Sequence, residues 1–128
     1  HVPEKDGILA CLLAAELVAS RGGARLKTLL QELYGEVGTF LTKRLSYRLE
    51  QSAVDGLEDR LKQPPGNLAG LAVIGVNRLD GVKMILEDGS WLLLRVSGTE
   101  PVVRLYAEAA SPERLDRLVT AGENFIGR

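Results

Sequence analysis

Residues 91–109 read WLLLRVSGTEPVVRLYAEA, two apolar runs joined by a short polar segment. In the second run Val103, Leu105 and Ala107 alternate with more polar residues, which is the period-2 pattern of a half-buried strand. The joining segment contains glycine and proline, the residues that mark turns. The stretch therefore predicts a strand, a tight loop and a second strand that returns beside the first.

The joining segment carries side chains suited to binding an anion. Arg95 and Arg104 stand on either side of it, and a guanidinium matches phosphate oxygens bidentately. The hydroxyls of Ser97 and Thr99 can donate to the same anion, and Gly98 lets backbone N–H groups approach it. The residue types thus indicate a phosphate site on a rigid strand–loop–strand base.

The same residues also fit a purely structural role. Ser-Gly-Thr is ordinary turn chemistry, and Arg104 can pair with Glu108 on the same face of its strand. Glu100 would repel phosphate, so we expect it to orient an arginine or to bond the backbone of the loop. Residue types alone leave the binding and the structural interpretations equally open.

Composition excludes several other kinds of site. The chain has 128 residues, 45% hydrophobic and 26% charged, the mix of a soluble globular protein of one domain or slightly more. Its net charge of −1 gives no general attraction to nucleic acid or to an anionic membrane. The single cysteine, Cys11, suits a reducing cytoplasm and is expected to be a small buried residue. One histidine and no Cys/His cluster predict no metal site.

The first part of the sequence predicts two helices and no strand. Asp6 can cap a helix whose leucines repeat with helical spacing as far as Gly22, and a second helix is expected over about residues 25–34. Its longest apolar run, from Ile8 to Ala15, is shorter than the ~20 residues that a membrane-spanning helix needs. Two helices cannot close a core alone. The absence of an initiator methionine also predicts that the chain was cut from something longer.

The second part predicts a mainly antiparallel sheet with helices on one face. Thr39 to Leu49 reads as a strand, and a short helix follows that Ser52 and Asp55 would cap. Four more strands are expected over residues 71–76, 82–87, 91–96 and 102–109, with Asp-Gly turns between the first three. Ser111 and Pro112 would begin a last helix. We therefore predict an α+β fold with a four- to five-stranded antiparallel sheet.

The loop sequence itself carries a more specific signal. The string Arg-x-Ser-Gly-Thr-Glu-Pro-x-x-Arg-x-Tyr-x-Glu, from Arg95 to Glu108, resembles the C-terminal signature of the α-D-phosphohexomutases, the phosphoglucomutase/phosphomannomutase family. In that family this loop grips the phosphate of the sugar phosphate. The resemblance therefore implies a role in substrate phosphate binding for Arg95, Ser97, Gly98, Thr99 and Arg104.

A second string lies at the start of the chain. His-x-x-Glu-Lys-Asp-Gly at residues 1–7 reads as a charged loop with a capping aspartate, but it also resembles a segment of the third domain of the same family. There the lysine points into the active site, so Lys5 would stabilise charge or act as an acid/base, and His1 would be a further substrate contact. The resemblance implies the C-terminal end of domain three at residues 1–38 and domain four at residues 39–128.

The parent enzyme implied by the resemblance interconverts hexose 1-phosphate and hexose 6-phosphate through a phosphoserine and a bisphosphorylated sugar. Its serine loop, its Asp-x-Asp-x-Asp loop for Mg²⁺ and its sugar-reading loop do not occur here. We therefore expect the chain alone to be inactive, to bind no cofactor and to need the missing N-terminal domains as partners. The sugar (glucose, mannose or glucosamine phosphate) stays open. So do two other classes, a stand-alone anion-binding module and an interaction domain with structural arginines.

Overall fold

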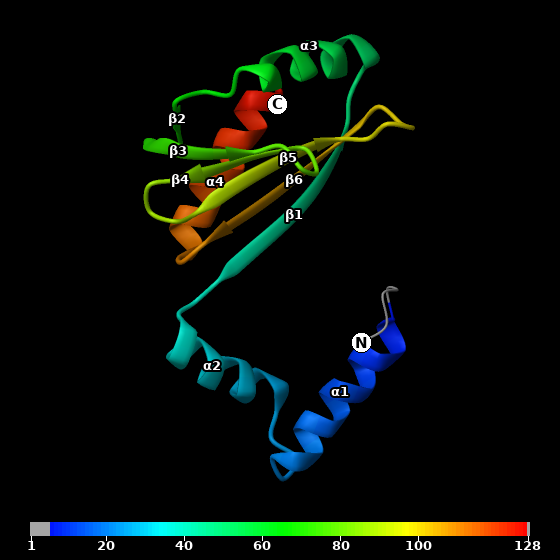
Figure 1. Cartoon of the computed structure of the whole chain (residues 1–128), viewed down its shortest axis with the longest axis vertical. Coiled ribbons are helices and arrows are strands. Elements are labelled where there is room, and N and C mark those ends of the chain that lie inside the picture. Colours follow the sequence, from blue (N-terminus) through cyan, green and yellow to red (C-terminus); the bar gives the residue numbers. More distant parts are fainter. Residues whose placement is uncertain (1–5, 128) are drawn as a thin grey trace. The chain divides into compact units, whose positions relative to one another are not determined.

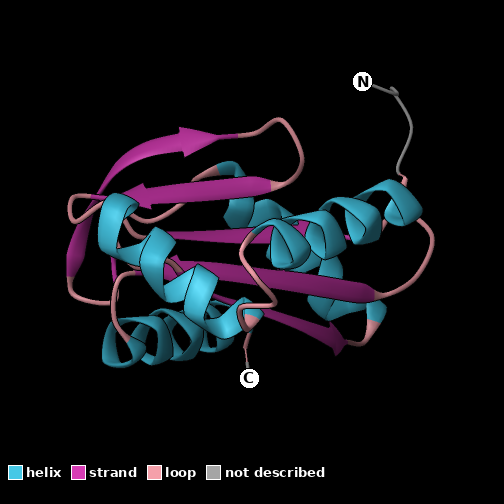
Figure 2. Cartoon of the chain, turned by 90° about the horizontal axis from the view of Figure 1, so that it is seen from below, coloured by secondary structure: helices cyan, strands magenta, loops and turns pink. Residues whose placement is uncertain are grey.

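The computed structural model describes residues 6–127, and the chain divides after Gly38 into two compact units (Figure 1). We call residues up to Gly38 the first unit and residues from Thr39 the second unit. Helices occur in both units, and all described strands belong to the second (Figure 2). The predicted α+β class is confirmed.

The first unit consists of helices α1 (Gly7–Ser20) and α2 (Leu26–Val37). Asp6 caps α1 as predicted, because its carboxylate accepts two backbone N–H groups of the first turn at 3.0 Å each. Neither helix has a buried residue. The expectation that Cys11 is buried is wrong, since this cysteine is exposed within its unit. Among residues 6–127 there is no helix with the length and apolar character to span a membrane.

The second unit is built on a six-stranded antiparallel sheet in the order β1-β6-β5-β4-β3-β2. The strands are β1 (Leu41–Arg48), β2 (Asn67–Leu68), β3 (Leu71–Asn77), β4 (Val82–Leu86), β5 (Trp91–Val96) and β6 (Val102–Ala109). β1 pairs with β6, so that the first and last strands along the chain are neighbours, with Leu45 opposite Leu105. This pairing brings the end of β1 beside the loop that precedes β6.

The sequence pattern does not predict β2, because the first central position of its turn is Ala69 instead of the usual Asn, Asp or Gly. Ala69 adopts a φ of +52° and Gly70 a φ of +83°, and the Arg114 guanidinium supports this turn by donating to the Ala69 carbonyl at 2.8 Å.

Arg114 also pairs with Asp88 at 2.9 Å. Burial raises the pKa of Asp88, but hydrogen bonds from Ser90 and the charge of Arg114 outweigh it and hold that pKa below its usual value.

Two helices, α3 (Gln51–Lys62) and α4 (Pro112–Ile126), cover one face of the sheet. Their inward side chains pack against the inward rows of the strands. The largest fully buried side chains of this core are those of Leu57, Met84, Leu86, Leu92, Leu94, Leu105, Leu118 and Val103. Each buried leucine contributes about 1.5–3 kcal/mol relative to an exposed one, so the core fixes which face each strand residue takes.

The two helices begin differently. α4 begins as predicted, with Pro112 in its first turn and the Ser111 hydroxyl accepting the N–H of Arg114. The predicted capping pair of α3 is wrong, because that helix already begins at Gln51 and its N-cap residue makes no side-chain cap bond. Asp55 instead accepts the Gln51 side-chain amide at 2.8 Å, one turn into the helix.

Candidate phosphate site

The candidate site is built on the hairpin of β5 and β6. The register of these strands places Arg95 directly opposite Arg104. At the end of the pairing, the Ser97 N–H donates to the Val102 carbonyl at 2.9 Å. The loop between the strands therefore begins at a hydrogen-bonded residue pair, Ser97 and Val102. The arginine pair lies on the two strands just before this point.

The two arginines lie on the sheet face opposite to α4. Val103 and Leu105, the neighbours of Arg104 along β6, are fully buried in the core, so strand alternation directs Arg104 and its partner Arg95 the other way. Like charges directly opposite each other on a sheet are destabilising. The arrangement costs stability in the free chain, and a bound anion would relieve the repulsion.

Arg95 has a carboxylate partner in the turn between β3 and β4. Its Nη1 lies 3.0 Å from Oδ2 of Asp80, while the Arg95 side chain remains 42% exposed. The turn packs closely on β5: Gly81 has a φ of +98°, and a Cβ there would lie 2.6 Å from the Leu94 carbonyl oxygen and 3.1 Å from the Arg95 Cα. Asp80 therefore orients Arg95, a role that the sequence suggested for Glu100.

Arg104 is differently placed. Within residues 6–127 its side chain makes no hydrogen bond or ion pair. The structural alternative, an ion pair with Glu108, does not form: the two residues are four apart along β6, about 13 Å between their Cα atoms, and Glu108 instead accepts the Trp91 indole N–H at 2.8 Å. The Glu100 carboxylate also has no hydrogen-bond partner in the described part of the chain. Arg104 is thus a cation that the fold itself does not use.

The loop leaves room for a ligand. Ser97 is half-buried, and Gly98, Thr99 and Glu100 are exposed. Gly98 does not have a left-handed backbone conformation, and a Cβ added to it would meet nothing within 4 Å. The fold does not require glycine there, so the absent side chain only opens space above the backbone. The other two candidate residues, His1 and Lys5, lie outside the described residues.

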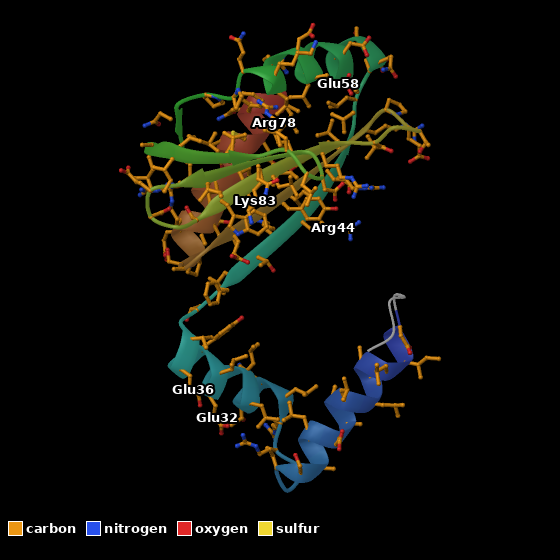
Figure 3. All side chains as sticks on the ribbon, in the orientation of Figure 1. Glu32, Glu36, Arg44, Glu58, Arg78 and Lys83 are labelled. Atoms are coloured by element: carbon orange, nitrogen blue, oxygen red, sulfur yellow. The ribbon has the colours of Figure 1, made fainter. Side chains whose placement is uncertain are left out.

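β1 adds side chains to this face that the sequence analysis assigned no role. Ser46 is opposite Arg104, and Arg44 is opposite Tyr106, with its guanidinium 5.5 Å from the centre of that ring. Figure 3 shows Arg44 projecting from the sheet. Arg48 follows at the end of the strand, beside the loop. The alternating pattern of residues 41–48 predicts which of them share a sheet face. It does not predict that β1 pairs with β6, and this pairing is what places them beside the candidate site.

The sequence of the second unit matches a known family. Residues 49–122 match the family model described as phosphoglucomutase/phosphomannomutase, C-terminal domain. A solved structure of a phosphoglucomutase/phosphomannomutase family protein from Burkholderia thailandensis aligns with 74% of this chain and 19% of its own, at a TM-score of 0.49 and 23% identity.

Curated relatives extend the match over most of the chain. A probable phosphoglucosamine mutase of Methanothermobacter thermautotrophicus is 35% identical over 95% of this chain and 26% of its own length. A phosphoglucomutase/phosphomannomutase of Thermococcus kodakarensis is 30% identical over 95% of this chain and 24% of its own. The chain therefore spans about a quarter of the length of these relatives. It belongs to the phosphoglucomutase/phosphomannomutase family, and its second unit contains the C-terminal domain of that family.

Proposed function

We propose that this chain is the C-terminal part of a phosphohexomutase and that its β5–β6 loop binds the phosphate of the sugar phosphate. The observation that carries this proposal is the cross-strand pair of Arg95 and Arg104, two like charges held opposite each other on an open sheet face. The hydroxyls of Ser97 and Thr99 and the open backbone at Gly98 lie in the loop just beyond them. Together these groups supply bidentate donors, hydroxyl donors and N–H groups for one phosphate.

In the proposed parent enzyme a phosphoserine outside this chain transfers its phosphoryl group to a hexose monophosphate. The resulting bisphosphorylated sugar then returns its other phosphoryl group to the serine, which converts hexose 1-phosphate into hexose 6-phosphate or the reverse. In each half of the cycle one phosphate does not react and needs to be held. The loop of Arg95 and Arg104 would hold it, which contributes to rate by orientation rather than by bond chemistry.

The remaining groups of the proposed enzyme have no geometry in this structure. Among the described residues no group of three or more His, Cys, Asp or Glu side chains could hold a metal ion. We propose that the Mg²⁺ of the parent enzyme is held by residues outside this chain. We propose that Lys5 stabilises charge or acts as acid/base in the parent enzyme, and that His1 is a substrate contact. The relatives are named for different sugars, so the proposal concerns the phosphate and not the sugar.

Titration with glucose 1-phosphate tests the binding role. We expect the backbone amide NMR signals of residues 97–104 to shift with added glucose 1-phosphate, because their N–H groups would meet the anion. Glucose without phosphate is the control and should leave the same signals in place. If neither sugar moved them, or if glucose alone produced the same shifts, the loop would not be a phosphate site.

An activity assay tests the proposal that this chain holds the substrate phosphate while the reacting groups lie elsewhere in the parent enzyme. The 128-residue chain should show no conversion of glucose 1-phosphate in the presence of Mg²⁺ and a bisphosphate activator, because it contributes only the phosphate-holding part. A longer polypeptide that continues upstream of His1 should convert it. Enzyme-like turnover by the chain alone would contradict the proposal that it is one part of a larger enzyme.

A further inference from the structure

The sheet face that carries Arg95 and Arg104 is strongly cationic. Its cations come from four neighbouring strands: Arg44 and Arg48 of β1, Arg104 of β6, Arg95 of β5 and Lys83 of β4. Figure 3 shows Arg44 and Lys83 projecting from the sheet. Among the described strand residues of this face, Glu108 is the one carboxylate, and it accepts the indole N–H of Trp91. The strand residues of this face therefore carry a net positive charge.

Three of the five cations have partners. Lys83 lies 3.8 Å from the centre of the Trp91 ring, Arg44 lies over Tyr106, and Arg95 pairs with Asp80. Arg48 and Arg104 make no hydrogen bond or ion pair within residues 6–127. The two cations without a partner are next to each other, at the end of the sheet where the loop begins.

The register defines their relative position. Ser46 is opposite Arg104 and Arg48 is opposite Val102, so Arg48 and Arg104 are diagonal neighbours about 7–8 Å apart, with their Cβ atoms somewhat closer. The neighbouring Tyr47 donates its hydroxyl to Glu123 of α4 at 2.6 Å, which fixes Tyr47 on the helix-covered face. Arg48 therefore takes the open face, the same face as Arg104.

The backbone ties this end of β1 to the loop. Directly after Arg48, the Leu49 N–H donates to the Pro101 carbonyl at 3.0 Å. β1, β6 and β5 are consecutive in the sheet. Arg48 and Arg95 are therefore two strand spacings apart across the sheet and two residues apart along it, a separation of about 12 Å, with Arg104 on the strand between them. Three guanidinium groups on adjacent strands thus surround the position above the start of the loop.

We propose that Arg48 is a third guanidinium ligand of the phosphate held by the β5–β6 loop. This inference rests on the proposed function and adds a residue from a strand outside the loop sequence. The ligand is a phosphate monoester dianion, whose charge complements a cluster that the fold leaves unpaired. An exposed arginine on a long flexible stem can reach an anion above Arg104, and its planar fork can add two parallel hydrogen bonds.

The test is a calorimetric titration of the whole chain with inorganic phosphate. Arg48→Gln should weaken phosphate binding roughly tenfold, the loss of one charge-assisted hydrogen bond. The matched control is Lys43→Gln, which removes one positive charge from the same strand but on the helix-covered side, where Lys43 lies 3.4 Å from Asp116. This control should keep the affinity of the unmodified chain within about twofold. If both variants weakened phosphate binding equally, the loss would reflect the net charge of the chain and not a contact from Arg48, and the inference would be overturned.

Further variants separate this inference from the proposed function. Arg104→Gln should abolish or strongly weaken phosphate binding if the loop is the site. If Arg104→Gln weakens binding and Arg48→Gln does not, the inference fails while the proposed function stands. If neither changes binding, both fail. Arg48→Lys keeps the charge and serves if the glutamine variant does not fold. It should still bind a few-fold more weakly because an ammonium cannot act as a fork, and full affinity in this variant would overturn the role of Arg48.

Discussion

At the scale of single residues, the site depends on the strand that carries each arginine and on the partner that orients its guanidinium. Arg95 lies on the central strand β5, and its guanidinium donates to the Asp80 carboxylate at 3.0 Å. An exposed ion pair of this kind adds little to stability, about 0–1 kcal/mol. Its effect is to limit the rotamers of Arg95, so that less side-chain entropy would be lost on the proposed binding of phosphate. Arg104 has no such partner in the described residues, and phosphate would supply it.

Gly81 is the residue whose replacement should disturb this arrangement most directly. Gly81→Ala should destabilise the fold by at least about 2 kcal/mol, because it adds left-handed strain and a clash with backbone. The clash arises because the new Cβ would lie 2.6 Å from the Leu94 carbonyl oxygen. Gly89→Ala is the matched control: Gly89 also has a positive φ, of +82°, but a Cβ there meets nothing within 4 Å.

Chemical denaturation of both variants makes the comparison. The control should lose only the strain of the backbone conformation, about 1 kcal/mol. Equal losses would mean that the turn does not pack on β5 as described, and the support of Arg95 by this turn would then be in doubt.

Individual residues differ in how far the sequence could predict them. The types and spacing of Arg95, Ser97 and Arg104 suffice to suggest an anion site, because these residues share one hairpin. Asp80 belongs to the turn between β3 and β4, and Arg48 belongs to β1, which is distant in sequence. Their spacing from the loop in the sequence therefore gives no sign that they lie near it. The same limit explains why an orienting role was expected of Glu100, the nearest carboxylate in sequence.

At the scale of elements, the position of the sheet is set by how closely α4 approaches it. Gly122 of α4 faces β5 and β6, and a Cβ at this position would lie 2.5 Å from Cδ1 of Leu105 and 3.1 Å from Cδ1 of Leu92. Both leucines are fully buried, so they have little room to move away. The small residue thus allows the helix to pack directly on the strands that carry the two arginines.

Two glycine-to-alanine substitutions test this packing. Gly122→Ala should destabilise the fold by about 1–2 kcal/mol, because the cost of overpacking exceeds the gain in helix propensity. Gly56→Ala in α3 should stabilise it by about 0.5–1 kcal/mol, since the nearest atom to a Cβ there is the flexible Arg60 Nη1 at 3.7 Å. Thermal unfolding measures both, and stabilisation by Gly122→Ala would contradict the close approach of α4.

Most elements could be predicted from alternation, helical spacing and Asp-Gly turns, because these signals are local. β2 could not, since its turn depends on a hydrogen bond to Ala69 from Arg114 in α4. The start of α3 was misplaced because Ser52 and Asp55 have the residue types of a capping pair but lie inside the helix. The number of strands and the exact helix ends therefore follow from tertiary contacts.

At the scale of the whole molecule, the two units differ in what supports them. The second unit has a continuous core, whereas α1 and α2 have no buried residue. The large apolar side chains exposed in the first unit are Ile8, Leu9, Leu12, Leu13, Leu17, Leu26, Leu30, Leu33 and Val37. We propose that the rest of domain three covers these side chains in the parent enzyme.

Hydrogen exchange of the isolated chain tests this difference. Amides of Leu12 and Leu13 should exchange far faster than those of Val103 and Leu105, because helices without buried contacts open locally at low cost. Exchange should be followed residue by residue under conditions where the second unit stays folded. Equal protection of the two groups would show that the first unit has a stable core of its own, against the domain assignment.

The central claim is that Arg95 binds phosphate through its planar fork and not merely through its charge. The most direct measurement is the dissociation constant of glucose 1-phosphate for the chain and for its Arg95→Lys variant, with thermal unfolding of both. Lysine keeps the charge but loses the fork. We predict binding weaker by about 1.5–3 kcal/mol, the value of a charge-assisted hydrogen bond, with little change in unfolding temperature. An unchanged dissociation constant, or a large fall in unfolding temperature, would contradict the claim and make Arg95 a structural residue.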